Sequence, residues 1–207
     1  MMRTDSPAGR TDRQAGFTLL ELAIVLLVIG LLLGGVLQGR QVVEAARSKR
    51  LALETAIVGD ALRTYRSLYA AWPGDDPRAG ERWPGAVAGN GNGMIDGHWW
   101  PERANEESSL VWSHLRHARL IAGEGSDTTP PRHPLGGRIG VGQRPLGLPG
   151  PAICLEEIPT QLAAGYDRQF DDGSWNTGRI RRSAPPLTGS GAEAGDPEMP
   201  VWICTQW

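Results

Sequence analysis

The 207-residue sequence lacks the motifs that identify the common catalytic sites. It contains no Gly-x-Ser-x-Gly nucleophile turn, no phosphate-binding loop and no Cys-His arrangement for a thiol nucleophile. Paired acidic residues do occur, but adjacent carboxylates are typical of solvated turns and do not indicate catalysis. We therefore expect a protein that is not an enzyme.

An excess of basic charge is also missing. The 21 Lys and Arg residues are balanced by 23 Asp and Glu residues, which gives a formal net charge of −2. A protein that binds nucleic acid through a basic surface carries a clear positive excess. The charge balance therefore gives no reason to expect a nucleic-acid partner.

Cysteine is scarce, with only Cys154 and Cys204 in the chain and no Cys-x-x-Cys pair to indicate a redox role. In an oxidising compartment the two would most simply form one disulfide, which would stabilise the fold by at most about 4 kcal/mol. In a reducing compartment they would be two free, buried thiols. The sequence favours the disulfide only if this part of the chain lies outside the cytoplasm.

Ionisable residues are absent from Phe17 to Leu37, with the single exception of Glu21. A helix of this length spans roughly 30 Å, the thickness of the hydrocarbon core of a bilayer. A cleaved secretory signal is disfavoured, because the apolar run is long and no Ala-x-Ala site follows it. A plain uncleaved anchor fits the apolar run, but it leaves unexplained a carboxylate that costs about 3 kcal/mol to place in lipid.

The residues at the start of this run resemble a known family. Gly16 followed by Phe17-Thr18-Leu19-Leu20-Glu21 is similar to the class III leader of type IV pilins and of type II secretion pseudopilins. In that family, a prepilin peptidase cuts after the glycine on the cytoplasmic side and methylates the new N-terminus. The resemblance implies that residues 1–16 are a cleaved leader, that Phe17 becomes the methylated first residue, and that Glu21 is the acidic fifth residue of the mature chain.

Glu21 is expected to act in assembly. When two such helices pack with an axial stagger, the ammonium group of Phe17 in one subunit can approach the Glu21 carboxylate of its neighbour, so that each charge compensates the other. The rival role, a proton-relay acid, would need other polar groups within the membrane, which this run lacks.

Partners and location follow from the resemblance. The expected partners are the prepilin peptidase, other pilin or pseudopilin subunits and the bacterial inner membrane, with the N-terminus in the cytoplasm and the head in the periplasm or in a filament. Charge counting alone leaves the topology open, because arginines lie on both sides of the apolar run.

A single long helix is predicted over residues 17–72, with a transmembrane part at 17–39 and an amphipathic continuation at 40–72. Pro73-Gly74 is a typical end for such a helix. Apolar residues at helical spacing form a stripe that is expected to pack on the globular head: Val43, Ala46, Leu53, Ile57, Ala61, Tyr65 and Leu68.

Residues 73–207 are predicted to form the head, an α+β unit in which the long helix lies across a small antiparallel sheet. Strands are predicted at 138–141, 152–155 and 200–205, and helices at 107–121, capped by Ser108 or Ser109, and at 159–166. Four phrases resemble the heads of some prepilin-family proteins: Trp72-Pro73-Gly74-Asp75-Asp76, Asn90-Gly91-Asn92-Gly93, Trp112-Ser113-His114-Leu115 and Asp171-Asp172-Gly173.

One loop of the head is a candidate metal site, although no cofactor is required. Asn90, Asn92 and Asp96 place oxygen-bearing side chains at alternate positions, as in part of a calcium loop, and Asp75-Asp76 or Asp171-Asp172 would add carboxylates if the fold brought them near. The alternative is a pair of ordinary Asn-Gly turns. His114 and His117 have a spacing that permits zinc binding, but without a third ligand we expect a solvated or interface pair.

The eight tryptophans all lie in the head, where we expect most of them to build the core, although Trp99-Trp100 or Trp207 would serve as a contact if exposed. The predicted function is a prepilin-like structural subunit of a type IV pilus or type II secretion pseudopilus. The alternative is a membrane-anchored periplasmic binding or enzymatic domain with a pilin-like anchor.

Overall fold

The computed structural model describes residues 18–100, 103–183 and 199–207. Gly16 and Phe17, the predicted processing residues, lie outside this part of the chain. Two compact units are present, Met1–Val43 and Glu44–Trp207, and the boundary between them falls inside helix α1.

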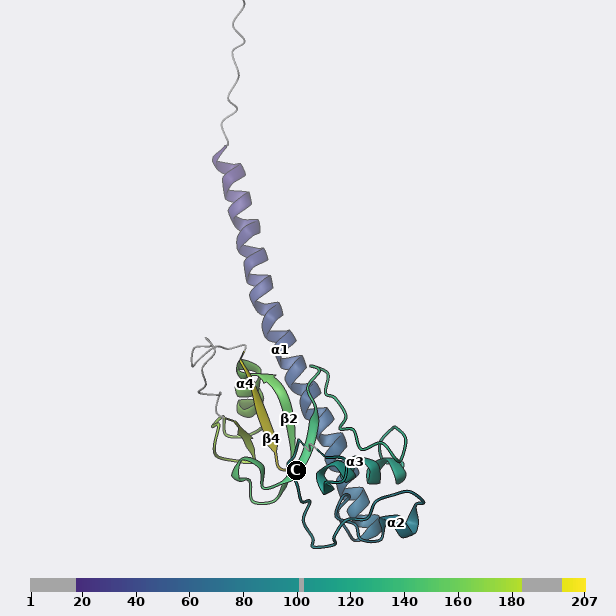
Figure 1. Cartoon of the computed structure of the whole chain (residues 1–207). Coiled ribbons are helices and arrows are strands. Elements are labelled where there is room, and N and C mark those ends of the chain that lie inside the picture. Colours follow the sequence, from purple (N-terminus) through teal and green to yellow (C-terminus); the bar gives the residue numbers. More distant parts are fainter. Residues whose placement is uncertain (1–17, 101–102, 184–198) are drawn as a thin grey trace, which may run out of the picture. The chain divides into compact units, whose positions relative to one another are not determined.

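Helix α1 runs from Leu19 to Tyr69 and is 51 residues long (Figure 1). It ends three residues before the predicted end at Trp72, because Ala70 takes a left-handed conformation with φ of 56° while its N–H still donates to the carbonyl of Arg66. A residue with positive φ cannot continue a right-handed helix, so the chain turns before it reaches Pro73.

The second unit contains a four-stranded antiparallel sheet in the order β1-β2-β4-β3 (Figure 1). This confirms the predicted α+β, pilin-like architecture of a long helix with a small antiparallel sheet. Strand β3 was absent from the sequence prediction, and α3 begins after Glu106, with no side-chain cap from Ser108 or Ser109. The elements after α1 are α2 (Ala79–Arg82), α3 (Glu107–His117), β1 (Ile139–Gln143), a short 3-10 turn η1 (Pro145–Gly147), β2 (Pro151–Pro159), α4 (Thr160–Phe170), β3 (Ile180–Arg182) and β4 (Pro200–Thr205).

One hydrophobic core joins the second half of α1 to one face of the sheet. On the strands it includes Ile153, Leu155 and Ile203, which alternate with residues of the opposite face. Thr55 of α1 also lies 3.3 Å from the hydroxyl of Tyr166 of α4. Most of the buried positions of α1 follow a spacing of three and four residues: Ser48, Leu51, Thr55, Val58, Leu62 and Tyr65. Gly59 and Ala61 beside them are buried as well.

The predicted apolar stripe of α1 was wrong in most of its positions. Ala61 and Tyr65 are buried, but Leu53, Ile57 and Leu68 are 60%, 49% and 61% exposed. The helix carries two apolar stripes. The one that faces the head includes Ser48 and Thr55, and because these side chains are polar the stripe was not recognised from the sequence. Thr55 can be buried because its hydroxyl donates to the carbonyl of Leu51 or Ala52.

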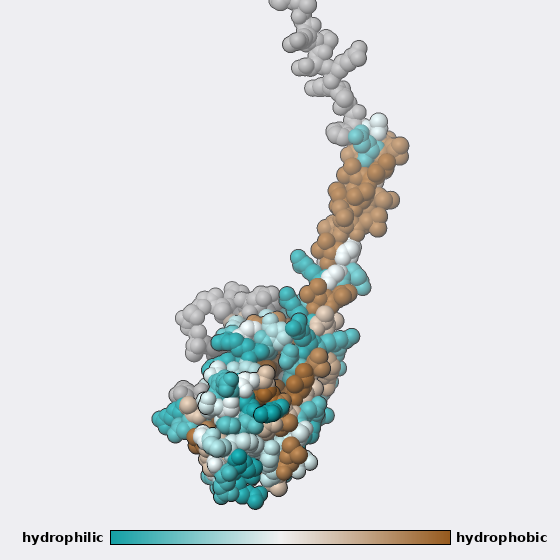
Figure 2. Space-filling view, turned by 90° about the vertical axis from the view of Figure 1, so that its right-hand side faces the viewer, coloured by the Kyte–Doolittle hydropathy of each residue, from teal (hydrophilic) through white to brown (hydrophobic). Residues whose placement is uncertain are grey.

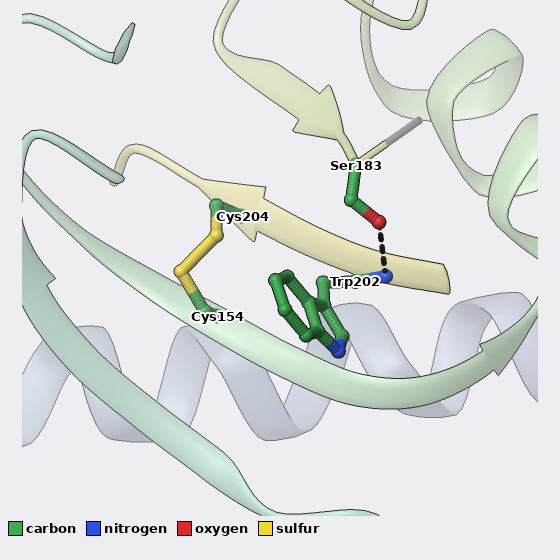
Figure 3. The surroundings of a disulfide bond; sticks show 4 residues. All are labelled: Cys154, Ser183, Trp202 and Cys204. Atoms are coloured by element: carbon green, nitrogen blue, oxygen red, sulfur yellow. Dashed lines mark hydrogen bonds between the residues drawn. A yellow bond between two sulfur atoms is a disulfide. The ribbon is translucent and has the colours of Figure 1, made fainter. Parts of the chain in front are cut away.

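A second, smaller cluster lies on the other face of the sheet, around the predicted disulfide. Cys154 of β2 and Cys204 of β4 are directly paired in the strand register and are joined, which confirms the prediction (Figure 3). Trp99, Leu148 and Ala152 complete the cluster. The sheet is therefore covered on both faces.

Replacing Leu62 by alanine tests which stripe of α1 faces the core. Leu62 is fully buried, so Leu62→Ala should lower the free energy of unfolding by about 3 kcal/mol, the usual cost of a cavity left by leucine. The matched variant Leu53→Ala, on the exposed stripe, should change it by no more than about 0.5 kcal/mol. Urea unfolding of the full chain in detergent, followed by tryptophan fluorescence, measures both; a larger loss for Leu53→Ala would contradict this packing.

Candidate functional site

The start of α1 is defined by Thr18 and Glu21. The hydroxyl oxygen of Thr18 accepts a hydrogen bond from the backbone N–H of Glu21 at 3.2 Å, which satisfies one of the free donors at the helix end. The Glu21 carboxylate lies in the first turn, where the helix dipole favours negative charge. Among the described residues it has no ion-pair or side-chain hydrogen-bond partner.

The first half of α1 is exposed along its whole described length. Every residue from Thr18 to Val36 is exposed, and the most apolar window of 18 residues has a mean hydropathy of 2.7. Apart from the adjacent residues and the helix's own backbone, nothing lies within 4 Å of the position that a Cβ would take on Gly30, Gly34, Gly35 or Gly39. By length and composition, this helix can cross a membrane. Figure 2 shows the hydrophobic side chains that cover it.

In the head, three of the four phrases that resemble prepilin-family heads, residues 72–76, 90–93 and 112–115, lie together in one hydrogen-bonded cluster. The Asp75 carboxylate accepts the N–H groups of Asn92 and Gly93, both at 2.9 Å. Glu107 of α3 accepts those of Asn90 and Asp96 at 2.8 and 2.9 Å. Burial raises the pKa of Glu107, and these donors oppose the rise. The prediction that paired acids are mostly solvated turns was wrong here, because Asp75, Asp76 and Glu107 are all buried.

The loop that was predicted to bind calcium is closed by its own side chains. The amide nitrogens of Asn90 and Asn92 both donate to the Asp96 carboxylate, at 2.9 and 2.8 Å. Their carbonyl oxygens accept backbone N–H groups from Asn92 and Met94. Asp75 is close by, but its two oxygens already accept N–H groups of this loop. Calcium binding stays a prediction, which these contacts do not require.

Asp171 and Asp172 do not join that loop. Together with Asp167 of α4 they place carboxylate oxygens within 4.8 Å of one another. Each already has donors: Asp167 accepts the N–H of Gly173, Asp171 accepts the N–H groups of Arg179 and Ile180, and Asp172 accepts the hydroxyl of Thr177. This cluster closes the turn between α4 and β3.

His114 is a buried structural residue, which corrects its interpretation as half of a solvated or interface pair. Its Nδ1 accepts the N–H of Gly74 at 2.8 Å, so its Nε2 carries the proton and donates to the carbonyl of Val87 at 2.8 Å. Burial lowers the pKa of His114, the hydrogen bond to the Val87 carbonyl opposes this, and the guanidinium of Arg82 adds to the lowering. The phrase Trp112-Ser113-His114-Leu115 resembles prepilin-family heads and so pointed to this region, but the burial of His114 was not predicted.

Comparison with known proteins addresses the N-terminal region. Residues 11–37 match the family model of the prokaryotic N-terminal methylation motif. The chain carries a class III prepilin leader. No curated protein and no solved structure shows significant similarity to the chain.

The matched residues include the three that were predicted to act in processing and assembly. Gly16, Phe17 and Glu21 all lie within the matched residues. The leader implies processing by prepilin peptidase, assembly with other pilin subunits and membrane anchoring through the apolar part of α1.

The pH dependence of stability tests the neutral state of His114. Because its folded pKa lies below the ordinary 6.5, its contribution to the free energy of unfolding is complete above pH 6.5 and is lost as the pH falls towards the folded pKa. His114→Gln replaces the imidazole, whose Nδ1 accepts the Gly74 N–H, with a side chain that does not titrate. The stability advantage of the wild type over this variant should therefore shrink between about pH 7.5 and pH 5.5.

Urea unfolding at several pH values measures this difference. His133, whose pKa is also lowered by burial, is present in both proteins and cancels in the comparison. A difference that stays constant over the pH range would contradict the role of the neutral imidazole.

Proposed function

We propose that this chain is a structural subunit of a type IV pilus or a type II secretion pseudopilus. Prepilin peptidase cleaves it after Gly16, residues 17–39 hold it in the inner membrane with the head in the periplasm, and α1 packs against other subunits. It is the substrate of an enzyme and not an enzyme itself. It requires no cofactor, and calcium at Asn90, Asn92 and Asp96 is an optional ligand in this proposal.

The observation that carries the proposal is the Glu21 carboxylate, which has no ion-pair partner among residues 18–100, 103–183 and 199–207, on an exposed apolar helix that directly follows a prepilin leader. Lipid can cover the apolar residues, but it cannot compensate the charge. The ammonium group of a neighbour's Phe17 supplies the opposite charge once cleavage has created it. Cleavage and assembly are therefore linked through the same two residues.

The second apolar stripe of α1 supports assembly along the head as well. Leu53, Ile57 and Leu68 lie about half a helical turn away from Leu51, Thr55 and Val58 and point away from the core. This stripe has no cover within the described residues. A neighbouring helix would bury it, as packed helices in bundles do.

The alternative is a membrane-anchored periplasmic binding or enzymatic domain. A simple anchor would need neither a methylated N-terminus nor the exposed stripe at Leu53 and Ile57. The state of the N-terminus therefore separates the two functions.

Mass spectrometry of the purified protein tests processing. In cells with active prepilin peptidase, we expect a mature chain that begins with N-methylated Phe17. Gly16→Leu should block cleavage, because the peptidase recognises the glycine, and should leave residues 1–16 attached. An intact leader on the wild-type protein, in cells where another prepilin is processed, would contradict the proposal.

Replacing Glu21 by alanine tests assembly. The variant should be inserted and processed, but its amount in sheared filaments should fall at least about tenfold, since the loss of a compensated charge pair in lipid exceeds 1.4 kcal/mol. Glu44→Ala is the matched control, because Glu44 is exposed on the same helix beyond the apolar run. Immunoblots of the membrane and filament fractions measure both, and normal incorporation of Glu21→Ala would refute the assembly role.

A further inference from the structure

The sheet face opposite the α1 core is lined by unusually small residues. In the strand register, Gly140 of β1 is opposite Cys154, and Cys154 is opposite Cys204, so these residues share that face. A side chain on Gly140 would collide with the backbone carbonyl oxygen of Trp99, and a Cβ on Gly142 would come within 2.8 Å of the Cβ of Trp99. The glycines of β1 thus allow the loop that carries Trp99 to lie directly on the sheet.

Three tryptophans meet on this face and come from two distant parts of the sequence. The ring of Trp99 packs edge-on against Trp100 and Trp202, with centroids 4.4 and 5.2 Å apart. Trp100 and Trp202 are 4.5 Å apart, and His98 lies 4.5 Å from Trp100. Trp202 is 37% exposed, and Figure 3 shows its ring beside the disulfide.

Backbone contacts fix the position of Trp202. Its N–H donates to the hydroxyl of Ser183 at 3.0 Å, and the N–H of Ser183 donates to the Trp202 carbonyl at 2.9 Å. The neighbouring Val201 and Ile203 are buried in the main core, so Trp202 is held on the outer face by the alternation of the strand. This exposed ring is preorganised, which favours binding.

A pocket of about 400 Å³ opens against these rings, which is within the usual range for small-molecule sites. We call it the tryptophan pocket. The described residues that line it include no carboxylate. Its lining is formed by Gly97, His98, Trp99, Trp100, Gly142, Gln143, Arg144, Pro145, Leu146 and Trp202.

One residue of the pocket lining, Gln143, carries a polar atom that is unpaired among the described residues. The Gln143 Oε1 atom is buried, and it accepts no hydrogen bond from any described residue. A buried acceptor without a donor costs about 1–3 kcal/mol, and such atoms are uncommon in folded proteins. The chain after Gln143 is also in an unusual conformation, with Arg144 at φ of 54° and Leu146 at φ of 51°. Left-handed residues of this kind concentrate at functional sites.

We infer that the tryptophan pocket binds a pyranose ring of a neutral saccharide. Such a ring presents an apolar face of C–H groups, which matches an exposed indole, and a rim of hydroxyl groups, which can form hydrogen bonds with the polar side chains of Gln143 and Arg144 in the lining. A cationic ligand fits less well, because the described lining has no carboxylate and includes Arg144.

The site does not depend on the proposed assembly. It lies on the sheet face opposite the core that contains α1, and the exposed stripe of α1 contributes no residue to the pocket lining. Saccharide binding and filament assembly can therefore fail separately. A monomeric full chain that binds the sugar would support this inference whether or not it polymerises.

Isothermal titration calorimetry of the full chain tests the site. The protein is kept in a polyoxyethylene detergent, because sugar-based detergents would compete for the pocket. The probes are hexasaccharides of glucose, N-acetylglucosamine, mannose and galactose, with a hexaproline peptide as the rival ligand. We expect saturable binding of at least one saccharide. No saturation by any of them up to about 10 mM, or saturation by hexaproline alone, would overturn the inference.

Two variants locate the binding. Trp202→Ala should weaken saccharide binding roughly tenfold, the upper worth of one aromatic contact. Trp175→Ala is the matched control, because Trp175 is 52% exposed but does not line the pocket, and it should leave the affinity unchanged. Equal weakening by the two variants would place the binding elsewhere.

Gln143→Leu separates a ligand-binding role from a structural one. It removes the unpartnered acceptor, so the melting temperature should stay the same or rise, while saccharide affinity should fall. A fall in melting temperature with unchanged affinity would show that Gln143 serves the fold and not the ligand.

Discussion

The need to cover apolar surface on one long helix is the constraint on which the whole structure depends. Helix α1 meets it in three ways along its length. Apart from Glu21, the surface from Leu19 to Val36 is apolar on all sides and suits lipid; from Ser48 to Tyr65 one stripe is covered by the head; and a second stripe, at Leu53 and Ile57, is exposed. The apolar first half and the exposed stripe are the surfaces that the proposed assembly would cover.

Buried polar groups hold the irregular part of the head in place. Residues 73–98 contain little regular structure, yet Asp75, Glu107 and His114 together accept five of the backbone N–H groups of that stretch. These contacts attach the loop to α3 and replace the hydrogen bonds that a strand or helix would provide. A loop rich in glycine can thereby keep one conformation.

Much of the architecture could be predicted from sequence, because its signals are local or strongly periodic. The leader, the apolar run, the strand at 200–205 and the pairing of two lone cysteines are of this kind. The stripe of α1 that faces the core was predicted at the wrong positions because it includes Ser48 and Thr55. These residues are polar, and only their contacts in the fold show that they are buried. The burial of Glu107 and His114, the short β3 and the meeting of Trp100 with Trp202 all depend on contacts between distant segments.

The disulfide also sets a mechanical limit. Cys154 and Cys204 are 50 residues apart in sequence but lie opposite each other on neighbouring strands. Under tension, load that reaches one cysteine passes directly to the other and bypasses α4 and β3. The loop closed by the disulfide, roughly 170 Å of chain at about 3.4 Å per residue, therefore cannot be stretched. A pulled head would lengthen only through the segments outside this covalent loop.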